Sequence, residues 1–477
     1  MSFWGKLKRA IKSNYSGYQS ARQHSRRRGT IPMGGLKDLR EDLRGSSRRQ
    51  MVVASRYVAR NSGYRQEAVN TMEEYAVGDG ITAQSTAPDA KAAAQYMDYW
   101  KAFSSRPEIT GRFDMSAVQR LLSRSLDIDG EIFIVKTFDL FDRPKIQLLE
   151  THQISSESDP EKRIWDGVKF DSVGRPKAYN KIVRTPDGKE RTISIPAQSV
   201  LHVFSAESAT AARGIPPGQH GLNYLRDHME LLAYETGAVK QASELGLVLK
   251  SNRETGLQDG DFALDSEGAT PATSEEDIAK KLGMRAIRID AEESIDSFQS
   301  NRPNSMFDGF LEMLERESTS RVPYELVRDA SKVGGAAVRM VGSKADRAFS
   351  HRQKVITSTA LSPLWTYVIG WGIDSGELPI STGWSRVQWQ FPRRFTVDAG
   401  REEQQARANV EGGLETMGNY LAERGIDFEQ HLMRRRDEAR KIMDAAGISA
   451  ETPIPLWMLY RPAGQQFDIG EKKGETE

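Results

Sequence analysis

Apolar residues recur at intervals of three and four over several long stretches of the chain, which is the spacing of one helix face. The first stretch runs from Leu36 to Tyr75 and is broken at Asn61-Ser62-Gly63. The same spacing predicts helices from Ala90 to Ser104 and from Ser116 to Asp127. The opposite side of the first stretch carries Arg40, Arg44, Arg48, Arg49, Arg56 and Arg60.

Short apolar runs separated by turn sequences follow between residues 131 and 204. Runs of this kind, bounded by Gly, Pro and Asp, predict strands joined by tight turns. Together with the preceding helices they predict an antiparallel α+β lobe. The expected strands are Glu131–Val135, Ile146–Leu149, Trp165–Phe170, Ala178–Val183 and Val200–Phe204, with turns at Asp142-Arg143-Pro144, Gly174-Arg175-Pro176 and Pro186-Asp187-Gly188.

The middle of the chain predicts two helices that carry a small unit between them. Apolar positions alternate three and four apart from Leu222 to Val239, so this helix is expected to pack against a neighbouring helix. A second helix is predicted from Asn304 to Ser320. The unit between them has expected strands at Leu247–Leu249 and Ala286–Ile289, and a short helix capped by Thr273 and Glu276.

A tether of small residues, Lys332 to Ala337, follows the second of these helices. Adjacent glycines, Gly334 and Gly335, leave the backbone free to adopt many conformations, so we expect a mobile loop. The next helix is predicted from Lys344 to about Leu361, with Ser343 as its N-cap. A mostly helical region then follows, with a helix start at Asp427, a stop at Gly447 and a partly disordered tail after Pro462.

Composition narrows the class of protein. The chain has 477 residues and no cysteine, which excludes disulfides, thiolate metal sites and cysteine nucleophiles. Residues 1–60 hold fifteen Lys and Arg against three acidic residues, a balance of +12, so the remaining chain sums to −11. No apolar run approaches the roughly 18 residues of a membrane helix, and no signal peptide is evident.

No catalytic constellation is visible in the sequence. The seven histidines are scattered and none forms a zinc-binding pair, and no phosphate-binding or nucleophile-elbow motif occurs. We therefore predict no catalytic residue, no metal site and no cofactor.

Three carboxylates, Asp308, Glu312 and Glu315, fall on one side of the second central helix. They have three interpretations: a solvated helix face, a Mg²⁺ site of a nuclease, or an acidic wall that repels phosphates if copies of this helix surround a channel. Lys332, Arg339 and Lys344 lie in or beside the tether and could contact phosphates without reading bases.

A series of short motifs in a fixed order resembles the portal proteins of tailed bacteriophages, most closely the lambda-type family. The resemblance extends from about Leu36 to Gly447. The motifs are Leu39-Arg40 through Arg60-Asn61-Ser62, Gly78-Asp79-Gly80-Ile81, Asp129-Gly130-Glu131, Ile146-Gln147-Leu148-Leu149-Glu150, Gly174-Arg175-Pro176 with Tyr179, Pro196-Ala197 with Val200 and His202, Arg213-Gly214-Ile215-Pro216, Val322-Pro323-Tyr324-Glu325-Leu326 with Asp329, Arg352-Gln353, Trp389, Pro392, Val397-Asp398, and Gly413-Leu414 with Thr416.

The resemblance implies an α+β portal fold whose copies, about a dozen, form a ring with a central channel. The parts implied are a basic N-terminal arm (1–35), a wing (36–217), a first stem helix (218–246), a clip (247–300), a second stem helix (301–321), a tunnel loop (322–342), a helix above the channel with a return to the wing (343–395), a helical crown (396–450) and a C-terminal tail (451–477). The residues assigned to the tunnel loop are Asp329, Lys332, Val333, Gly334, Gly335 and Arg339, and those assigned to the channel wall are Asp308, Glu312 and Glu315.

The implied function is that of a head-tail connector and not of an enzyme. The ring would sit at one capsid vertex of the virion, assemble in the host cytoplasm, conduct duplex DNA during packaging and ejection, and nucleate the shell. Its expected partners are the large terminase subunit, capsid or scaffold proteins and tail adaptors, with no membrane. Where familiar members carry a polar Asn-Tyr-Ser-Ser-Ala-Arg run, this chain has Gly334 to Arg339, which favours a small collar over a gripping loop. A metal-dependent nuclease at Asp308, Glu312 and Glu315 and a purely structural ring are the alternatives.

Overall fold

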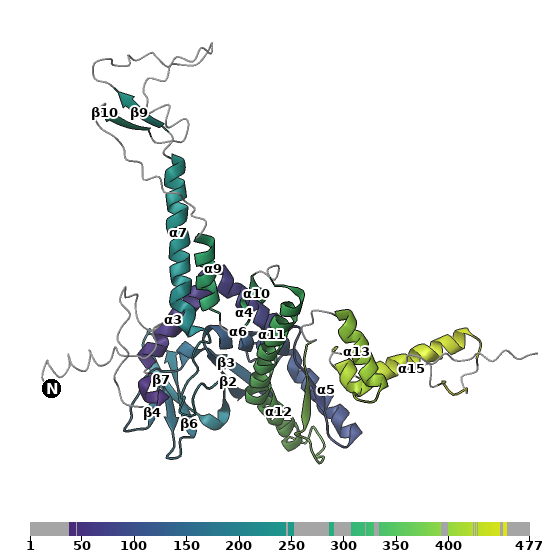
Figure 1. Cartoon of the computed structure of the whole chain (residues 1–477). Helices are drawn as coiled ribbons and strands as arrows, with labels where there is room; N and C mark the ends of the chain where they lie inside the picture. The colour runs from purple at the N-terminus through teal and green to yellow at the C-terminus, as the bar shows by residue number, and fades with distance from the viewer. Residues whose placement is uncertain are drawn as a thin grey trace, which may run out of the picture. The chain divides into compact units, whose positions relative to one another are not determined.

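The computed structural model describes residues 38–43, 45–244, 247–251, 286–290, 307–319, 321–328, 333–392, 399–422, 424, 426, 428–448 and 452–455. The chain divides into two compact units (Figure 1). Unit 1 comprises Met1–His220 and Thr319–Glu477, and unit 2 comprises Gly221–Ser318. Each unit is described by itself below.

Unit 1 begins with the helices that the sequence predicts, and most of their starts have a side-chain cap. Ser62 separates α3 from α4 and its hydroxyl accepts a hydrogen bond from the backbone N–H of Arg65. Asp89 and Asp114 cap the next two helices in the same way, which satisfies backbone donors that have no partner within the helix. The helices are α2 (Leu39–Asp42), α3 (Gly45–Asn61), α4 (Gly63–Ala76), α5 (Ala90–Ser105) and α6 (Met115–Ile128).

The predicted strands form two antiparallel sheets, so the antiparallel α+β lobe is confirmed. One sheet has the order β3-β2-β8 and the other the order β4-β5-β6-β7. A shared core lies between them, with Phe133, Leu149 and Tyr179 among its buried members. The strands are β2 (Glu131–Phe138), β3 (Pro144–Leu149), β4 (Ile164–Trp165), β5 (Val168–Phe170), β6 (Pro176–Arg184), β7 (Glu190–Pro196) and β8 (Val200–Phe204). Two short 3-10 helices, η2 (Thr151–Gln153) and η3 (Ala197–Ser199), lie between them. Outside these sheets, β1 (Thr82–Ser85) pairs with β11 (Val387–Gln390).

A long helical run lies alongside the β3-β2-β8 sheet (Figure 1). It consists of α11 (Gly335–Ile356), a π-helical turn (Thr357–Leu361) and α12 (Ser362–Asp374). Buried side chains such as Phe349 and Trp365 hold the run against the rest of unit 1. The short helix α10 (Tyr324–Val327) precedes it.

The start of α11 corrects one prediction. The sequence predicts a loop up to residue 342 and an N-cap at Ser343, but the helix begins at Gly335 and Gly334 occupies the N-cap position. Glycine costs about 1 kcal/mol relative to alanine inside a helix. The alanines at 336 and 337 and the buried anchor Ala345 favour the helix, so it continues through the predicted tether.

Unit 2 contains the predicted pair of helices and the predicted pair of strands. Helices α7 (Leu222–Glu244) and α9 (Phe307–Glu317) pack against each other, as the heptad spacing predicts. Strands β9 (Leu247–Ser251) and β10 (Ala286–Asp290) pair in parallel. Thr273 and Glu276, predicted to cap a short helix, lie outside the described residues.

Three helices make up the C-terminal part: α13 (Ala399–Glu411), α14 (Met417–Ala422) and α15 (Phe428–Ala445). Gly447 has φ of 71°, and the last helix ends just before it as predicted. Asp427, the predicted start signal, lies outside the described residues. Among the residues that the structure describes, no helix is both long and apolar enough to cross a membrane.

Candidate functional site

The exposed face of α11 is basic. Its exposed charged positions are Arg339, Lys344, Arg347 and Lys354, with His351 beside them. No exposed position of α11 holds Asp or Glu, since its single acidic residue, Asp346, is half-buried. A helix face of this kind attracts phosphates through charge.

The opposite face of α11 is fixed to α6 by a buried ion pair. The guanidinium of Arg352 donates to both carboxylate oxygens of Asp127, at 2.6 and 3.1 Å, and to the backbone carbonyl of Ser123 at 2.6 Å. Both charged side chains are buried. The bidentate geometry fixes the rotation of α11, and therefore determines which side chains of the helix are exposed.

The predicted loop residues lie at the start of α11. Gly334 and Gly335 are exposed, and a Cβ added to either would have no atom within 4 Å. Val333 precedes them at a bend, and Arg339 lies in the second turn of the helix. Asp329 and Lys332 lie outside the described residues.

The three carboxylates of α9 do not form one exposed face. Asp308 is exposed, and Glu312 pairs with Arg316 at 3.0 Å on the same helix. Glu315 is buried against α7, with a carboxylate oxygen 3.4 Å from Nε2 of His228. The prediction of a wall of three exposed carboxylates is therefore wrong for Glu315, because helix packing turns that position toward α7.

The same contacts bear on the nuclease interpretation. Two of its three proposed carboxylates already have basic partners within unit 2. Across the described part of the chain, no group of three His, Asp or Glu side chains is placed to hold a metal ion.

A second cluster of charges is buried in unit 1 around Glu131. Arg213 donates to both of its carboxylate oxygens, and Arg48 donates at 3.2 Å. His202 donates from Nε2 at 2.9 Å, and the backbone N–H of Gly214 donates at 2.8 Å. Both carboxylate oxygens of Glu131 thus accept several hydrogen bonds. The cluster connects α3, β2, β8 and the segment after β8.

The cluster shifts the pKa of its members. Burial alone would raise the pKa of Glu131, but Arg213, Arg48 and the hydrogen bond from His202 hold it well below its usual range. Burial lowers the pKa of His202, and this outweighs the opposing effect of Glu131. At neutral pH the cluster therefore holds an ionised carboxylate and a neutral imidazole.

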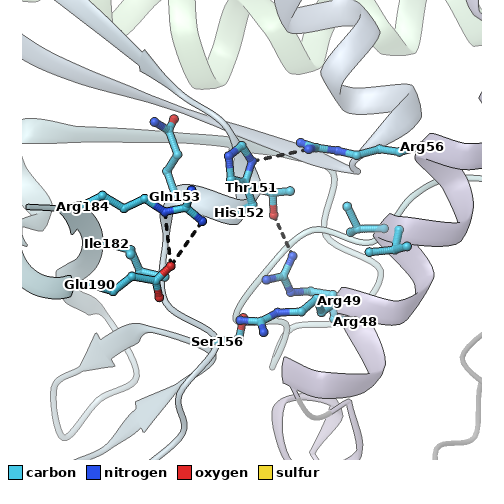
Figure 2. Close-up of a pocket in the computed structure, with 12 residues that line it drawn as sticks. Arg48, Arg49, Arg56, Thr151, His152, Gln153, Ser156, Ile182, Arg184 and Glu190 are labelled. Carbon is cyan, nitrogen blue, oxygen red and sulfur yellow. Dashed lines mark hydrogen bonds and ion pairs between the residues drawn. The ribbon is translucent and has the colours of Figure 1, made fainter. Parts of the chain in front are cut away.

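A basic cavity opens beside this cluster (Figure 2). It has a volume of about 570 Å³ and lies between α3, η2 and the strands β6 and β7. Arg49 and Arg56 of α3 face Arg184 of β6 across it, and Val53 lines it as well. Arg48, predicted on the polar side of its helix, is instead buried, because Glu131 and Asp166 neutralise it.

Sequence reasoning recognised the members of the Glu131 cluster only as separate motifs. Glu131 and Arg213 are 82 positions apart, and nothing in the local pattern pairs them. The one available signal was chemical: a carboxylate inside the apolar run Glu131–Val135 requires a buried cation as partner.

Comparison with known proteins identifies the class. A family model described as phage portal protein, lambda family, matches residues 33–353. Because the match covers more than half of the chain, the chain belongs to the lambda family of phage portal proteins. The motifs from Trp389 to Thr416 lie beyond the matched range, so their assignment remains a prediction.

Three solved structures are similar over most of the chain. They are the neck of an empty gene transfer agent (GTA) particle computed with C6 symmetry (13% identity, TM-score 0.42, covering 78% of this chain and 93% of that chain), the virion of a native GTA particle (14%, 0.41, 79% and 93%) and the neck of a native GTA particle computed with C12 symmetry (14%, 0.41, 79% and 94%). No match was found among curated proteins.

Proposed function

We propose that this chain is the subunit of a portal ring of about a dozen copies, and that duplex DNA passes through the centre of the ring. The exposed basic face of α11 would line the narrow part of the channel. The start of the helix, from Val333 to Arg339, would form the collar closest to DNA, together with Asp329 and Lys332.

The basic face of α11 is the observation that carries this proposal. Arg339, Lys344, Arg347 and Lys354 are exposed without an exposed acidic neighbour on the helix. Affinity for DNA rises steeply with each cation that contacts a phosphate. A few cations per copy, arranged in a ring, would centre the duplex through its phosphates, which are the same for every base sequence.

The glycines at the start of α11 fit a part that touches a moving polymer. Gly334 and Gly335 have no side chain, and a Cβ added to either would have no atom within 4 Å. The collar would therefore present backbone and small side chains to the DNA. Asp308 and Glu312 of α9 would supply the acidic part of the wall, without Glu315.

The ring would act at one vertex of the virion. It would nucleate the shell, receive DNA from a terminase motor in the host cytoplasm, and later connect to tail proteins. ATP hydrolysis would belong to the motor, since the sequence has no phosphate-binding loop.

Charge reversal on α11 tests the proposal. The variant combines Arg339→Glu, Lys344→Glu and Arg347→Glu, and its matched control combines Lys177→Glu, Lys189→Glu and Arg191→Glu at exposed positions of β6, β7 and the turn between them. Particles are assembled with each variant, and their DNase-resistant DNA is measured. We expect roughly a tenfold loss or more for the α11 variant and little loss for the control.

The alternatives predict other results. A purely structural ring would give normal DNA content with both variants. A nuclease would cleave plasmid DNA with Mg²⁺ and lose that activity on Glu312→Ala, and either result would contradict the proposal.

A further inference from the structure

Two turns of unit 1 share the same construction. In the β2–β3 turn, Oδ1 of Asp139 accepts hydrogen bonds from the backbone N–H groups of Phe141 (2.8 Å) and Arg143 (3.0 Å). In the β5–β6 turn, Oδ1 of Asp171 accepts from Val173 (2.9 Å) and Arg175 (2.8 Å). Both are five-residue turns that begin with Asp and end with Arg.

The three residues between these ends differ. The β5–β6 turn has Ser172-Val173-Gly174, with glycine at the position of positive φ (91°). The β2–β3 turn has Leu140-Phe141-Asp142, with aspartate at the corresponding position (φ 56°). Since glycine adopts positive φ without cost and aspartate does not, the local fold does not call for Asp142.

The local fold does not call for the two apolar side chains either. Leu140 is 99% exposed and Phe141 is 80% exposed. Nothing in the described chain covers them, and the matching turn is built with Ser172 and Val173. Two adjacent large apolar side chains at a protruding tip, flanked by carboxylates, are typical of a surface that another molecule buries.

We infer that the β2–β3 turn of one copy inserts into the basic cavity beside α3 of the next copy in the ring. The inference rests on the proposed ring and specifies one of its contacts. The occupant is a second copy of this chain, and the contact is head-to-tail.

The cavity is complementary to the turn in both charge and apolar surface. Val52, Val53 and Ile182 provide an apolar lining for Leu140 and Phe141. Arg49, Arg56 and Arg184 surround that lining and would face Asp139 and Asp142.

One of these cations is available for a partner. Arg56 pairs with Asp129 and Glu150, and Arg184 pairs with Glu190. Arg49 is exposed and hydrogen-bonds only the hydroxyl of Ser156 among the described residues. An incoming carboxylate would complete the ion pairing of the cavity at Arg49.

The turn and the cavity lie on different parts of unit 1. The end of β2 that leads into the turn lies beside α12, since the ring of Phe138 packs against Tyr367 and Trp371 with centroids 5.9 and 6.4 Å apart. The cavity lies beside α3 and β7, and Figure 1 shows these two elements apart from α12. A contact between two different, complementary surfaces forms a ring when the rotation between copies closes, whereas a self-complementary surface stops at a dimer.

Residues 1–37 of the chain are a less suitable occupant. They contain nine Lys and Arg and no Asp or Glu, so Arg49 and Arg56 would repel them. Charge thus favours the acidic turn.

Exchanging the sequence of the β2–β3 turn tests the contact between copies without disturbing the folding of the single copy. The combined substitutions Leu140→Ser, Phe141→Val and Asp142→Gly convert the β2–β3 turn to the sequence of the β5–β6 turn. The turn itself is preserved and its positive φ is relieved, so thermal unfolding of the single copy should be unchanged or shifted upward. We expect the concentration at which half of the copies are in rings, measured by mass photometry, to rise at least tenfold.

The outcomes are distinct. If the exchanged variant forms rings at the wild-type concentration, the inference is wrong while the ring itself stands. If the wild type forms no ring at any concentration, the proposed function fails, and this inference fails with it.

Cysteine cross-linking tests the identity of the cavity. The chain has no cysteine, so a variant with Phe141→Cys and Val53→Cys has no competing thiol. Oxidised rings should give a ladder of covalent species beyond the dimer on a non-reducing gel. The control replaces Phe141→Cys with Val173→Cys, at the matching turn, and should give no ladder. Equal ladders from both variants, or none from the first, would overturn the inference.

Discussion

The guanidinium of Arg213 forms a bidentate pair with the carboxylate of Glu131, with Nη2 2.6 Å from Oε1 and Nε 3.0 Å from Oε2. Both side chains are buried, and Arg213 also donates to the backbone carbonyls of Thr151 and Asp166. This pair fixes the segment after β8 against the start of β2. It therefore holds together the body on which the basic cavity is built.

Loss of Arg213 should be severe. Arg213→Met leaves Glu131 buried with fewer cations, and breaking a buried pair in this way costs about 3–5 kcal/mol. Urea unfolding, at a concentration where the protein is a single copy, measures the loss. Arg175→Met is the control, because its pair with Asp171 lies on the surface, and it should leave the unfolding midpoint unchanged. Similar midpoints for both variants would contradict the role given to the cluster.

Stability should fall in mildly acidic solution because of His202. Burial lowers the pKa of this histidine below its ordinary value of 6.5, so below pH 6.5 the unfolded chain binds a proton that the folded chain does not. Folding free energy is then lost as pH falls, by at most about 1.4 kcal/mol per pH unit for one proton. His202→Gln should flatten the slope between pH 5 and 6.5, measured by urea unfolding. An unchanged slope would mean that His202 does not titrate as inferred.

Glu131 also makes the folded state less stable as the pH falls, but over a lower pH range than His202. Its pKa is held below the ordinary value of 4.5, so the stability that it contributes is complete above pH 4.5 and is lost as pH falls through the folded pKa.

Gly130 should tolerate no side chain. Its φ is 84°, and a Cβ would lie 2.2 Å from the carbonyl carbon of Ile215. Gly111 has φ of 69°, and a Cβ there would have no atom within 4 Å. An alanine at this position therefore measures the cost of the positive φ alone, without a steric clash. Gly111→Ala should cost about 1–2 kcal/mol, and Gly130→Ala about 3 kcal/mol or more. Equal losses in urea unfolding would show that the close approach to Ile215 is not rigid.

Larger side chains at the proposed collar should reduce DNA packaging without preventing ring assembly. A Cβ added at Gly334 or Gly335 would have no atom within 4 Å, so copies with Gly334→Val and Gly335→Val should fold and form rings. Larger side chains at the collar should hinder the passage of DNA, and packaged DNA length is the measurement. Normal length in particles with intact rings would exclude a collar at these glycines.

Local patterns predicted the elements of the fold well. The three- and four-residue periods predicted α3 to α7, and the turn sequences predicted the meander, because both signals are properties of short segments. The start of α11 was missed because a glycine pair looks like a loop in isolation. The packing of Ala345 and Phe349, which determines the helix, is a tertiary property.

The candidate site was less accessible from sequence. The spacing of Asp308, Glu312 and Glu315 gives one helix face, but it does not say that Glu315 contacts His228 of α7. In the same way, the sequence around Arg48 and Arg49 does not indicate which of the two is buried. Only the meeting of α3 with β2 makes the first buried and the second exposed.

Electron microscopy of the purified full-length chain, at a resolution that places α11, tests the central claim most directly. The account predicts closed rings with a central hole, and the face of α11 that carries Arg339, Lys344 and Arg347 turned toward that hole. Single copies at every concentration, or rings in which this face points away from the hole, would contradict it.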